Sequence, residues 1–138
     1  ALVQVLRERG VTLVCLAGFM RLLGPAFCEA FPDRVLNIHP SLLPAFPGMR
    51  AQAQALRHGV KVSGATVHFV TPALDDGPIV LQEAVPVYDD DTEETLSARI
   101  LEVEHRIYPE AVRRVLAGGW RVEGRRVLFA STDSRDER

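Results

Sequence analysis

The sequence is poor in the residues that mark extracellular, metal-binding and nucleic-acid-binding proteins. It has two cysteines, Cys15 and Cys28, without a CxxC pattern, which excludes a disulfide framework and predicts two reduced packing residues. The four histidines lack the spacing of zinc ligands, so we expect no metal site. Lys61 is the only lysine, and 16 basic against 18 acidic side chains give a net charge of -2. This balance offers no electrostatic attraction to a phosphate backbone, and nucleic acid is not an expected partner.

Long apolar runs are also missing. None approaches the roughly 18 residues of a membrane span, and the first ten residues lack the basic-then-apolar order of a secretory signal. We therefore expect no membrane partner and a cytoplasmic location. The 47% of hydrophobic residues in a chain of 138 suffices for one globular domain, which we place at 1–130, with a polar tail at 131–138.

Apolar runs alternate with helical patterns along the first two thirds of the chain. Runs rich in β-branched residues have the length of strands: 11–18, 34–38, 63–70 and 78–87. Helical spacing predicts short helices at 25–31 and 52–58. The alternation is typical of an α/β protein with a mostly parallel sheet, in which the last two of these strands are placed to pair as neighbours.

The last third of the chain predicts a long helix and a short hairpin. Asp91 followed by Glu94 has the form of a capping box. An apolar stripe at helical spacing follows: Leu96, Ile100, Val103, Ile107, Val112 and Val115. Gly118 ends the helix, and 121–129 predicts a hairpin.

The strongest chemical signal is the segment NIHPSLLP, in which a strand ends. Asn37 and His39 are two residues apart in an extended chain, so their side chains lie on one face, and Pro40 stiffens the exit. Ligands of open α/β sheets bind beyond the carboxyl ends of the strands, where this amide and imidazole would converge. The structural alternative is that Asn37 caps a turn and His39 fills a polar niche.

Two further segments carry candidate groups. In ALDDGP a carboxylate facing the imidazole would orient it and keep it charged, and spacing leaves both Asp75 and Asp76 open. In GFMRLLGP the apolar residues around Arg21 suit the wall of a pocket for a flat heteroaromatic ligand, although ordinary helix packing explains them as well. His68 alternates with apolar strand residues and is typical of a structural histidine, and Glu104 reads as a solvated charge on the long helix.

Five segments, in this order and spacing, resemble the phosphoribosylglycinamide formyltransferases, the folate-dependent transformylases of purine biosynthesis: LAGFMRLLGPAF, NIHPSLLPAFPG, GATVHFV, LDDGPIVLQEAVPV and EHRIYPEAV. The resemblance covers about 13–120 and implies an open, mostly parallel, doubly wound Rossmann-like sheet. Pro40 and the near-neutral charge separate the chain from two similar families. Deformylases typically carry a second histidine at that position, and methionyl-tRNA formyltransferases a small residue in a longer, basic chain.

The resemblance implies roles for single residues. Asn37, His39 and Asp75 match the catalytic trio of the family, which chooses Asp75 over Asp76. Glu104 matches the acidic residue that meets the substrate ribose, and Pro40 is assigned to the same substrate site. The positions that match the folate site are Met20, Arg21, Leu22, Leu23, Asn37, Val70, Thr71 and Asp75.

The implied reaction transfers a formyl group from 10-formyltetrahydrofolate to the amine of glycinamide ribonucleotide, by direct attack and without a metal. Asn37 and His39 would stabilise the developing oxyanion, and Asp75 would favour the charged imidazole. Both expected partners are small molecules, and the resemblance allows a homodimer.

Two alternatives stay open. A formyltetrahydrofolate deformylase would release formate without an amine acceptor. A folate-binding fragment would be inactive alone, because the Gly/Asn/Ser loop that binds the substrate phosphate in the family is not found in this sequence.

Since the sequence opens with Ala1 inside a helical pattern, we expect it to be roughly the carboxyl-terminal two-thirds of a doubly wound domain that lacks its first strands. Full activity of the isolated chain would contradict the interpretation as an inactive folate-binding fragment.

Overall fold

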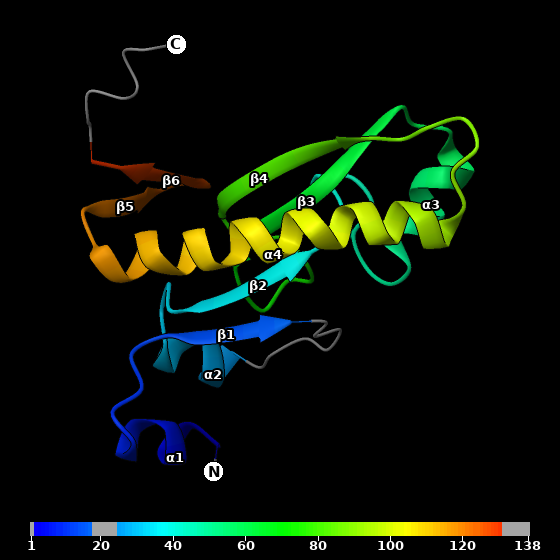
Figure 1. Cartoon of the computed structure of the whole chain (residues 1–138). Coiled ribbons are helices and arrows are strands. Elements are labelled where there is room, and N and C mark those ends of the chain that lie inside the picture. The colour runs from blue at the N-terminus through cyan, green and yellow to red at the C-terminus, as the bar shows by residue number, and fades with distance from the viewer. Residues whose placement is uncertain (1, 18–24, 131–138) are drawn as a thin grey trace.

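The structure is a computed structural model that describes residues 2–17 and 25–130. Its strands form one open sheet in the order β1-β2-β3-β4-β6-β5 (Figure 1). The strands are β1 (Val14–Ala17), β2 (Val35–His39), β3 (Val62–Phe69), β4 (Ile79–Pro86), β5 (Trp120–Glu123) and β6 (Arg126–Phe129). The helices are α1 (Leu2–Glu8), α2 (Pro25–Ala30), α3 (Ala51–His58) and α4 (Glu93–Ala117). None of these described helices has the length and apolarity of a membrane span.

The predicted α/β fold is confirmed, including the long helix and the carboxyl-terminal hairpin. Strand directions are mixed: β1 with β2 and β4 with β6 pair in parallel, whereas β2 with β3, β3 with β4 and β5 with β6 pair antiparallel. The expected pairing of the third and fourth strands is confirmed as well. Their antiparallel direction follows from the short connection 70–78, because a parallel pair needs a crossover of a dozen or more residues.

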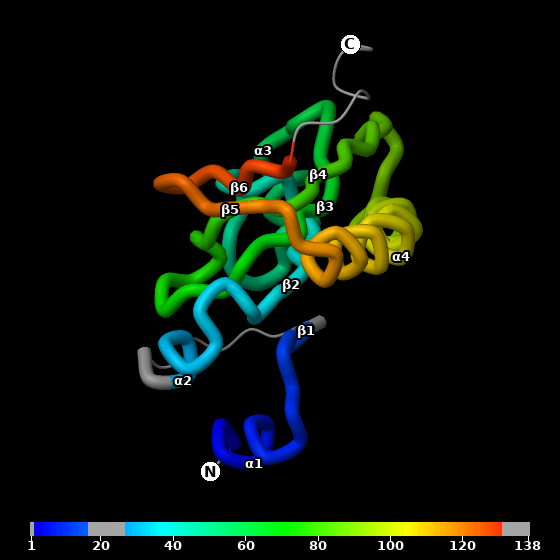
Figure 2. The backbone as a smooth tube through the Cα atoms, turned by 90° about the vertical axis from the view of Figure 1, so that its left-hand side faces the viewer, coloured from blue at the N-terminus to red at the C-terminus, as the bar shows by residue number. Residues whose placement is uncertain are grey.

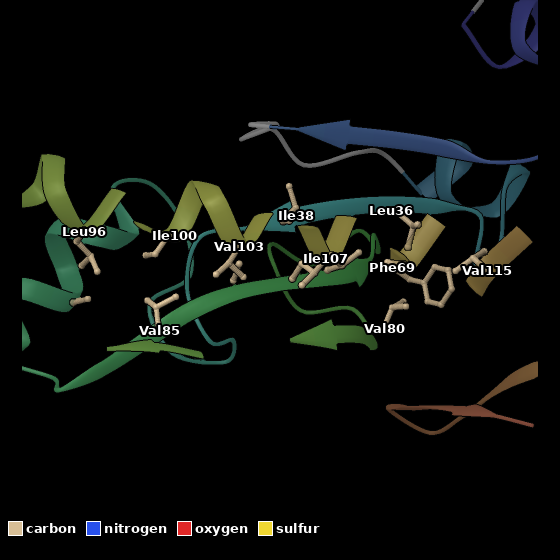
Figure 3. Close-up of a cluster of buried hydrophobic side chains, with 14 residues drawn as sticks. Leu36, Ile38, Phe69, Val80, Val85, Leu96, Ile100, Val103, Ile107 and Val115 are labelled. Carbon is tan, nitrogen blue, oxygen red and sulfur yellow. The ribbon is translucent and has the colours of Figure 1, made fainter. Parts of the chain in front are cut away.

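Helix α4 covers one face of the sheet, and α2 lies on the opposite side of β2 (Figures 1 and 2). The buried side chains of α4 point at apolar side chains of the central strands (Figure 3). They are Leu96, Ile100, Val103, Ile107, Ala111 and Val115. Ala111 is the fully buried residue where the sequence pattern predicted Val112, since steps of four residues from Ile107 continue the stripe, and Val112 packs half-buried at the margin of the core.

The predicted packing role of the cysteines holds only in part. Both are free, but Cys15 is exposed on β1 and Cys28 is half-buried on α2.

The capping box of α4 lies one residue later than predicted. Thr92 is the N-cap, its hydroxyl accepts from the Thr95 amide at 3.2 Å, and the Thr95 hydroxyl accepts from the Thr92 amide at 2.9 Å. Asp91 does not cap, because its carboxylate binds Arg99 through two hydrogen bonds of 2.8 Å. The Arg99 guanidinium holds the pKa of Asp91 well below its usual range. Glu94 is exposed in the first turn of the helix.

This cap can be tested by substitution. Thr92→Ala removes the acceptor for the Thr95 amide and should lower the free energy of unfolding by about 1 kcal/mol. Glu94→Gln, which the sequence pattern would have made equally damaging, should cost only about 0.3 kcal/mol through the helix dipole. Urea unfolding of both variants measures the two losses in the free energy of unfolding. Equal losses would contradict the observed cap.

Candidate functional site

The sheet face that turns away from α4 is polar at its centre. Leu36 and Ile38 of β2 belong to the core under α4, so Asn37 and His39 point to the opposite side. In the antiparallel register of β2 with β3, Asn37 lies opposite His68 and His39 lies opposite Thr66. These four polar residues are all buried. The sequence thus places two histidines and an amide side by side at the end of β2.

The connection 70–78 brings Asp75 back over this face, and two features shape it. A Cβ on Gly77 would lie 1.7 Å from a backbone oxygen of β3, so only glycine permits this close approach. The neighbouring Asp76 turns to the hairpin, where Arg125 donates to its backbone oxygen at 2.6 Å and to its carboxylate at 3.2 Å. The two adjacent aspartates therefore have different environments, and Asp75 is the one at the site.

Asp75 lies between the two histidines. One carboxylate oxygen is 3.5 Å from Nδ1 of His39, and the other is 3.8 Å from Nε2 of His68. The backbone amide of Gly48 donates to Asp75 at 2.8 Å. The side chains of the histidines are 2% exposed and that of Asp75 is 5% exposed, so water screens these charges little.

Hydrogen-bond partners define the proton positions on the rings. Nε2 of His39 lies 2.8 Å from the Phe46 carbonyl, which can only accept, so Nε2 carries a proton. Its other nitrogen, Nδ1, faces the Asp75 carboxylate at 3.5 Å, which is longer than a normal hydrogen bond. Nδ1 of His68 donates to the Phe69 carbonyl at 3.1 Å, which leaves its Nε2 as the unprotonated nitrogen in the neutral ring.

Two buried polar atoms have no hydrogen-bond partner among the described residues at this site. They are Oδ1 of Asn37 and Nε2 of His68. Burial of an unsatisfied polar atom costs about 1–3 kcal/mol, which a polar ligand can recover. The arrangement thus offers an amide and two imidazole rings beside a carboxylate, with two polar atoms available to bind a ligand.

The structure brings the predicted catalytic residues together. Most of the other predicted site residues either lie near them in the chain or fall outside the described residues. Asn37, His39 and Asp75 form one cluster, and Pro40 directly follows it. Val70 and Thr71 begin the connection that carries Asp75. The remaining predicted folate positions lie outside the described residues: Met20, Arg21, Leu22 and Leu23.

Glu104 is not joined to this cluster by any hydrogen bond or ion pair within the described part of the chain. It lies on α4, on the other side of the sheet, where its side chain is half-buried. Burial raises the pKa of the Glu104 carboxyl, and nearby His105 opposes that shift. A substrate role for Glu104 stays a prediction.

The pattern in the sequence missed His68. It was expected to be a satisfied sheet histidine, yet its Nε2 is unpartnered among the described residues and faces Asp75. The signal that would have found it is the antiparallel pairing of the second and third strands, which sets His68 opposite Asn37.

A family model described as "Formyl transferase" matches residues 1–112. The chain belongs to the formyl transferase family. The resemblance seen in the five sequence segments is therefore confirmed, and the polar cluster is the candidate active site of a family member.

Individual relatives agree with this membership. The chain is 47% identical over 116 residues to a protein of Bacillus subtilis named phosphoribosylglycinamide formyltransferase, and the match covers 84% of this chain and 60% of that protein. It is 61% identical, with a TM-score of 0.91, to the crystal structure of glycinamide ribonucleotide transformylase 1 from Symbiobacterium toebii, covering 94% of this chain and 61% of that one. The chain thus spans about three fifths of the length of these relatives.

The fold is shared with a relative of different name. A formyltetrahydrofolate deformylase from Pseudomonas syringae is 32% identical with a TM-score of 0.87, and the match covers 94% of this chain and 44% of that one. Backbone similarity alone therefore does not separate the two kinds of family member.

His68 predicts a pH dependence of stability. Burial lowers the pKa of this imidazole, and the Phe69 carbonyl and Asp75 oppose the shift only in part. The folded protein therefore binds the proton less readily than the unfolded chain, whose histidine pKa is about 6.5, and the free energy of unfolding falls as the pH drops below that value. In urea unfolding, the natural full-length protein should lose more of its free energy of unfolding between about pH 7.5 and pH 5.5 than its His68→Gln variant does.

The matched control is His105→Gln, at an exposed position of α4. It should keep the pH dependence of the natural protein. An unchanged pH dependence in His68→Gln would contradict the assignment of the proton-linked loss to His68.

Proposed function

We propose that this chain carries the catalytic site of a phosphoribosylglycinamide formyltransferase, which transfers a formyl group from 10-formyltetrahydrofolate to the amine of glycinamide ribonucleotide. The observation that carries the proposal is the buried cluster of Asn37, His39 and Asp75 at the end of β2. Its donor and acceptor atoms suit an acyl transfer in which charge develops on one oxygen.

The first step is attack of the neutral amine on the formyl carbon, which places negative charge on the formyl oxygen. The Asn37 amide nitrogen can donate to this oxygen, and its unpartnered Oδ1 can accept from the amine N–H. Nδ1 of His39 stands 3.5 Å from Asp75, beyond a normal hydrogen bond, and is the ring nitrogen that is freer to donate to a ligand. Collapse of the oxyanion then breaks the bond between the formyl carbon and the folate nitrogen. That nitrogen takes up a proton, the attacking amine gives one up, and tetrahydrofolate leaves without a covalent intermediate on the protein.

Asp75 supports this step through charge. A carboxylate 3.5 Å from His39 favours the imidazolium form, which then balances the developing oxyanion. The Gly48 amide holds the carboxylate in place with a hydrogen bond of 2.8 Å. Because both side chains are almost fully buried, their fields act in a medium of low dielectric constant, where they are stronger than in water.

The substrates are assigned to the surroundings of this cluster. We place the folate beside the connection 70–78, with the segment 20–23 as a further predicted contact, and the glycinamide ribonucleotide beside Pro40. The contact of its ribose with Glu104 stays a prediction from the resemblance. The reaction needs no metal, and the proposed setting is purine biosynthesis in the cytoplasm. The names of the relatives support the substrate class.

Removal of the central groups tests the proposal. In the natural full-length protein, His39→Ala should abolish formyl transfer while the affinity for a folate analogue survives, since the ring acts on the reacting oxygen. Asn37→Ala should lower kcat by about 10² to 10³, the cost of losing one oxyanion donor. Steady-state kinetics and calorimetric titration with the analogue measure both effects.

The control for these variants is His105→Ala, an exposed histidine outside the cluster, which should leave kcat unchanged. Near-normal turnover by His39→Ala would refute the proposed role of the cluster.

A deformylase is the second candidate, because the Pseudomonas relative shares the fold. The two reactions differ in the acceptor of the formyl group, which is an amine in one case and water in the other. With 10-formyltetrahydrofolate as the only substrate, we expect formate at the background rate, and rapid turnover once glycinamide ribonucleotide is added. Rapid formate release without the amine would establish the hydrolase instead.

A further inference from the structure

The loop between β2 and α3, residues 40–50, binds both His39 and Asp75 through its backbone. Its Phe46 carbonyl accepts from His39 at 2.8 Å, and its Gly48 amide donates to Asp75 at 2.8 Å. The separation of His39 and Asp75 therefore depends on where this loop lies. Any group that fixes the loop also fixes the geometry of the pair.

Thr66 fixes the first half of this loop. Its hydroxyl donates to the Ser41 carbonyl at 2.7 Å and accepts from the Leu43 amide at 3.1 Å. Gln82 donates to the same hydroxyl at 3.0 Å and to the Leu43 carbonyl at 2.9 Å. A hydroxyl has one proton and two lone pairs, so Thr66 uses its full hydrogen-bonding capacity, and it is 0% exposed.

The position of Thr66 in the sheet explains this arrangement. It lies opposite His39 on β2 and opposite Gln82 on β4, so the three residues form one row across three strands. Ser41, also 0% exposed, extends the connection, because its hydroxyl donates to the Ala45 carbonyl at 2.5 Å, next to Phe46. The row thus links β4 to the carbonyl that holds His39.

We propose that Thr66, oriented by Gln82, is a positioning residue for formyl transfer, which sets loop 40–50 and through it the placement of His39 relative to Asp75. This inference rests on the proposed function. It assigns Thr66 no contact with substrate: its hydroxyl acts only through the backbone of the loop. A displacement of about 1 Å in a reacting group can cost about 10²-fold in rate, so the effect belongs in kcat.

The test compares two substitutions in the natural full-length protein. Thr66→Val keeps the shape and removes the hydroxyl, whereas Thr66→Ser keeps the hydroxyl. We expect Thr66→Val to lower kcat per folded molecule about 10- to 100-fold, with KM for the folate changed much less, and Thr66→Ser to restore most of kcat. A purely structural role would lower the yield and stability of Thr66→Val and leave kcat per folded molecule unchanged.

Two further variants keep the test decisive. Gln82→Met, at an exposed position, removes both donated hydrogen bonds and should lower kcat even if Thr66→Val does not fold. Ser63→Ala removes a buried hydroxyl of β3 that has no partner in the described residues, and it should leave kcat unchanged.

Different results would refute the proposed function and the positioning role of Thr66. Natural protein without transferase activity would refute the proposed function. Active natural protein with unchanged kcat in Gln82→Met and in folded Thr66→Val would refute the positioning role alone.

Discussion

The pairing of β2 with β3 in one register is the constraint on which both the core and the candidate site depend. Side chains alternate between the two faces of these strands, so Leu36 and Ile38 face α4 while Asn37 and His39 face away from it. A slip by one residue would place the polar residues under α4 and the apolar ones at the site. The apolar contacts with α4 therefore stabilise the register that the chemistry requires.

The opposite face gains its chemical character from burial. A carboxylate between two imidazoles, all with little exposure, is costly unless every charge has a partner. The backbone of loop 40–50 supplies two of these partners, at Phe46 and Gly48. Asp75 itself adopts a positive φ of 49°, a conformation that non-glycine residues rarely take. Strain of this kind persists where the surrounding structure holds it, and it is common at functional sites.

Much of the fold could be predicted from local patterns, because the strands, the turns and the apolar stripe of α4 each depend on residues that are close together in the sequence. The patterns also placed Asn37 and His39 on one face. The errors arose where a distant residue decided the outcome. Asp91 looked like a helix cap, but Arg99 binds it, and Thr92 caps instead.

The same reason explains what the sequence left open at the site. Spacing did not separate Asp75 from Asp76, because the choice depends on Arg125 in the hairpin, far along the chain. The local pattern predicts a structural role for His68, because its position opposite Asn37 follows from strand pairing and not from its neighbours in sequence. Long-range pairing was thus the missing information in both cases.

The central claim is that Asn37 and His39 meet the reacting formyl group. A crystal structure of the natural full-length protein with a non-transferring analogue of 10-formyltetrahydrofolate tests it most directly. We expect the oxygen equivalent to the formyl oxygen to lie about 3 Å from the Asn37 amide nitrogen and within hydrogen-bond reach of the His39 ring. An analogue bound with this oxygen remote from both side chains would contradict it.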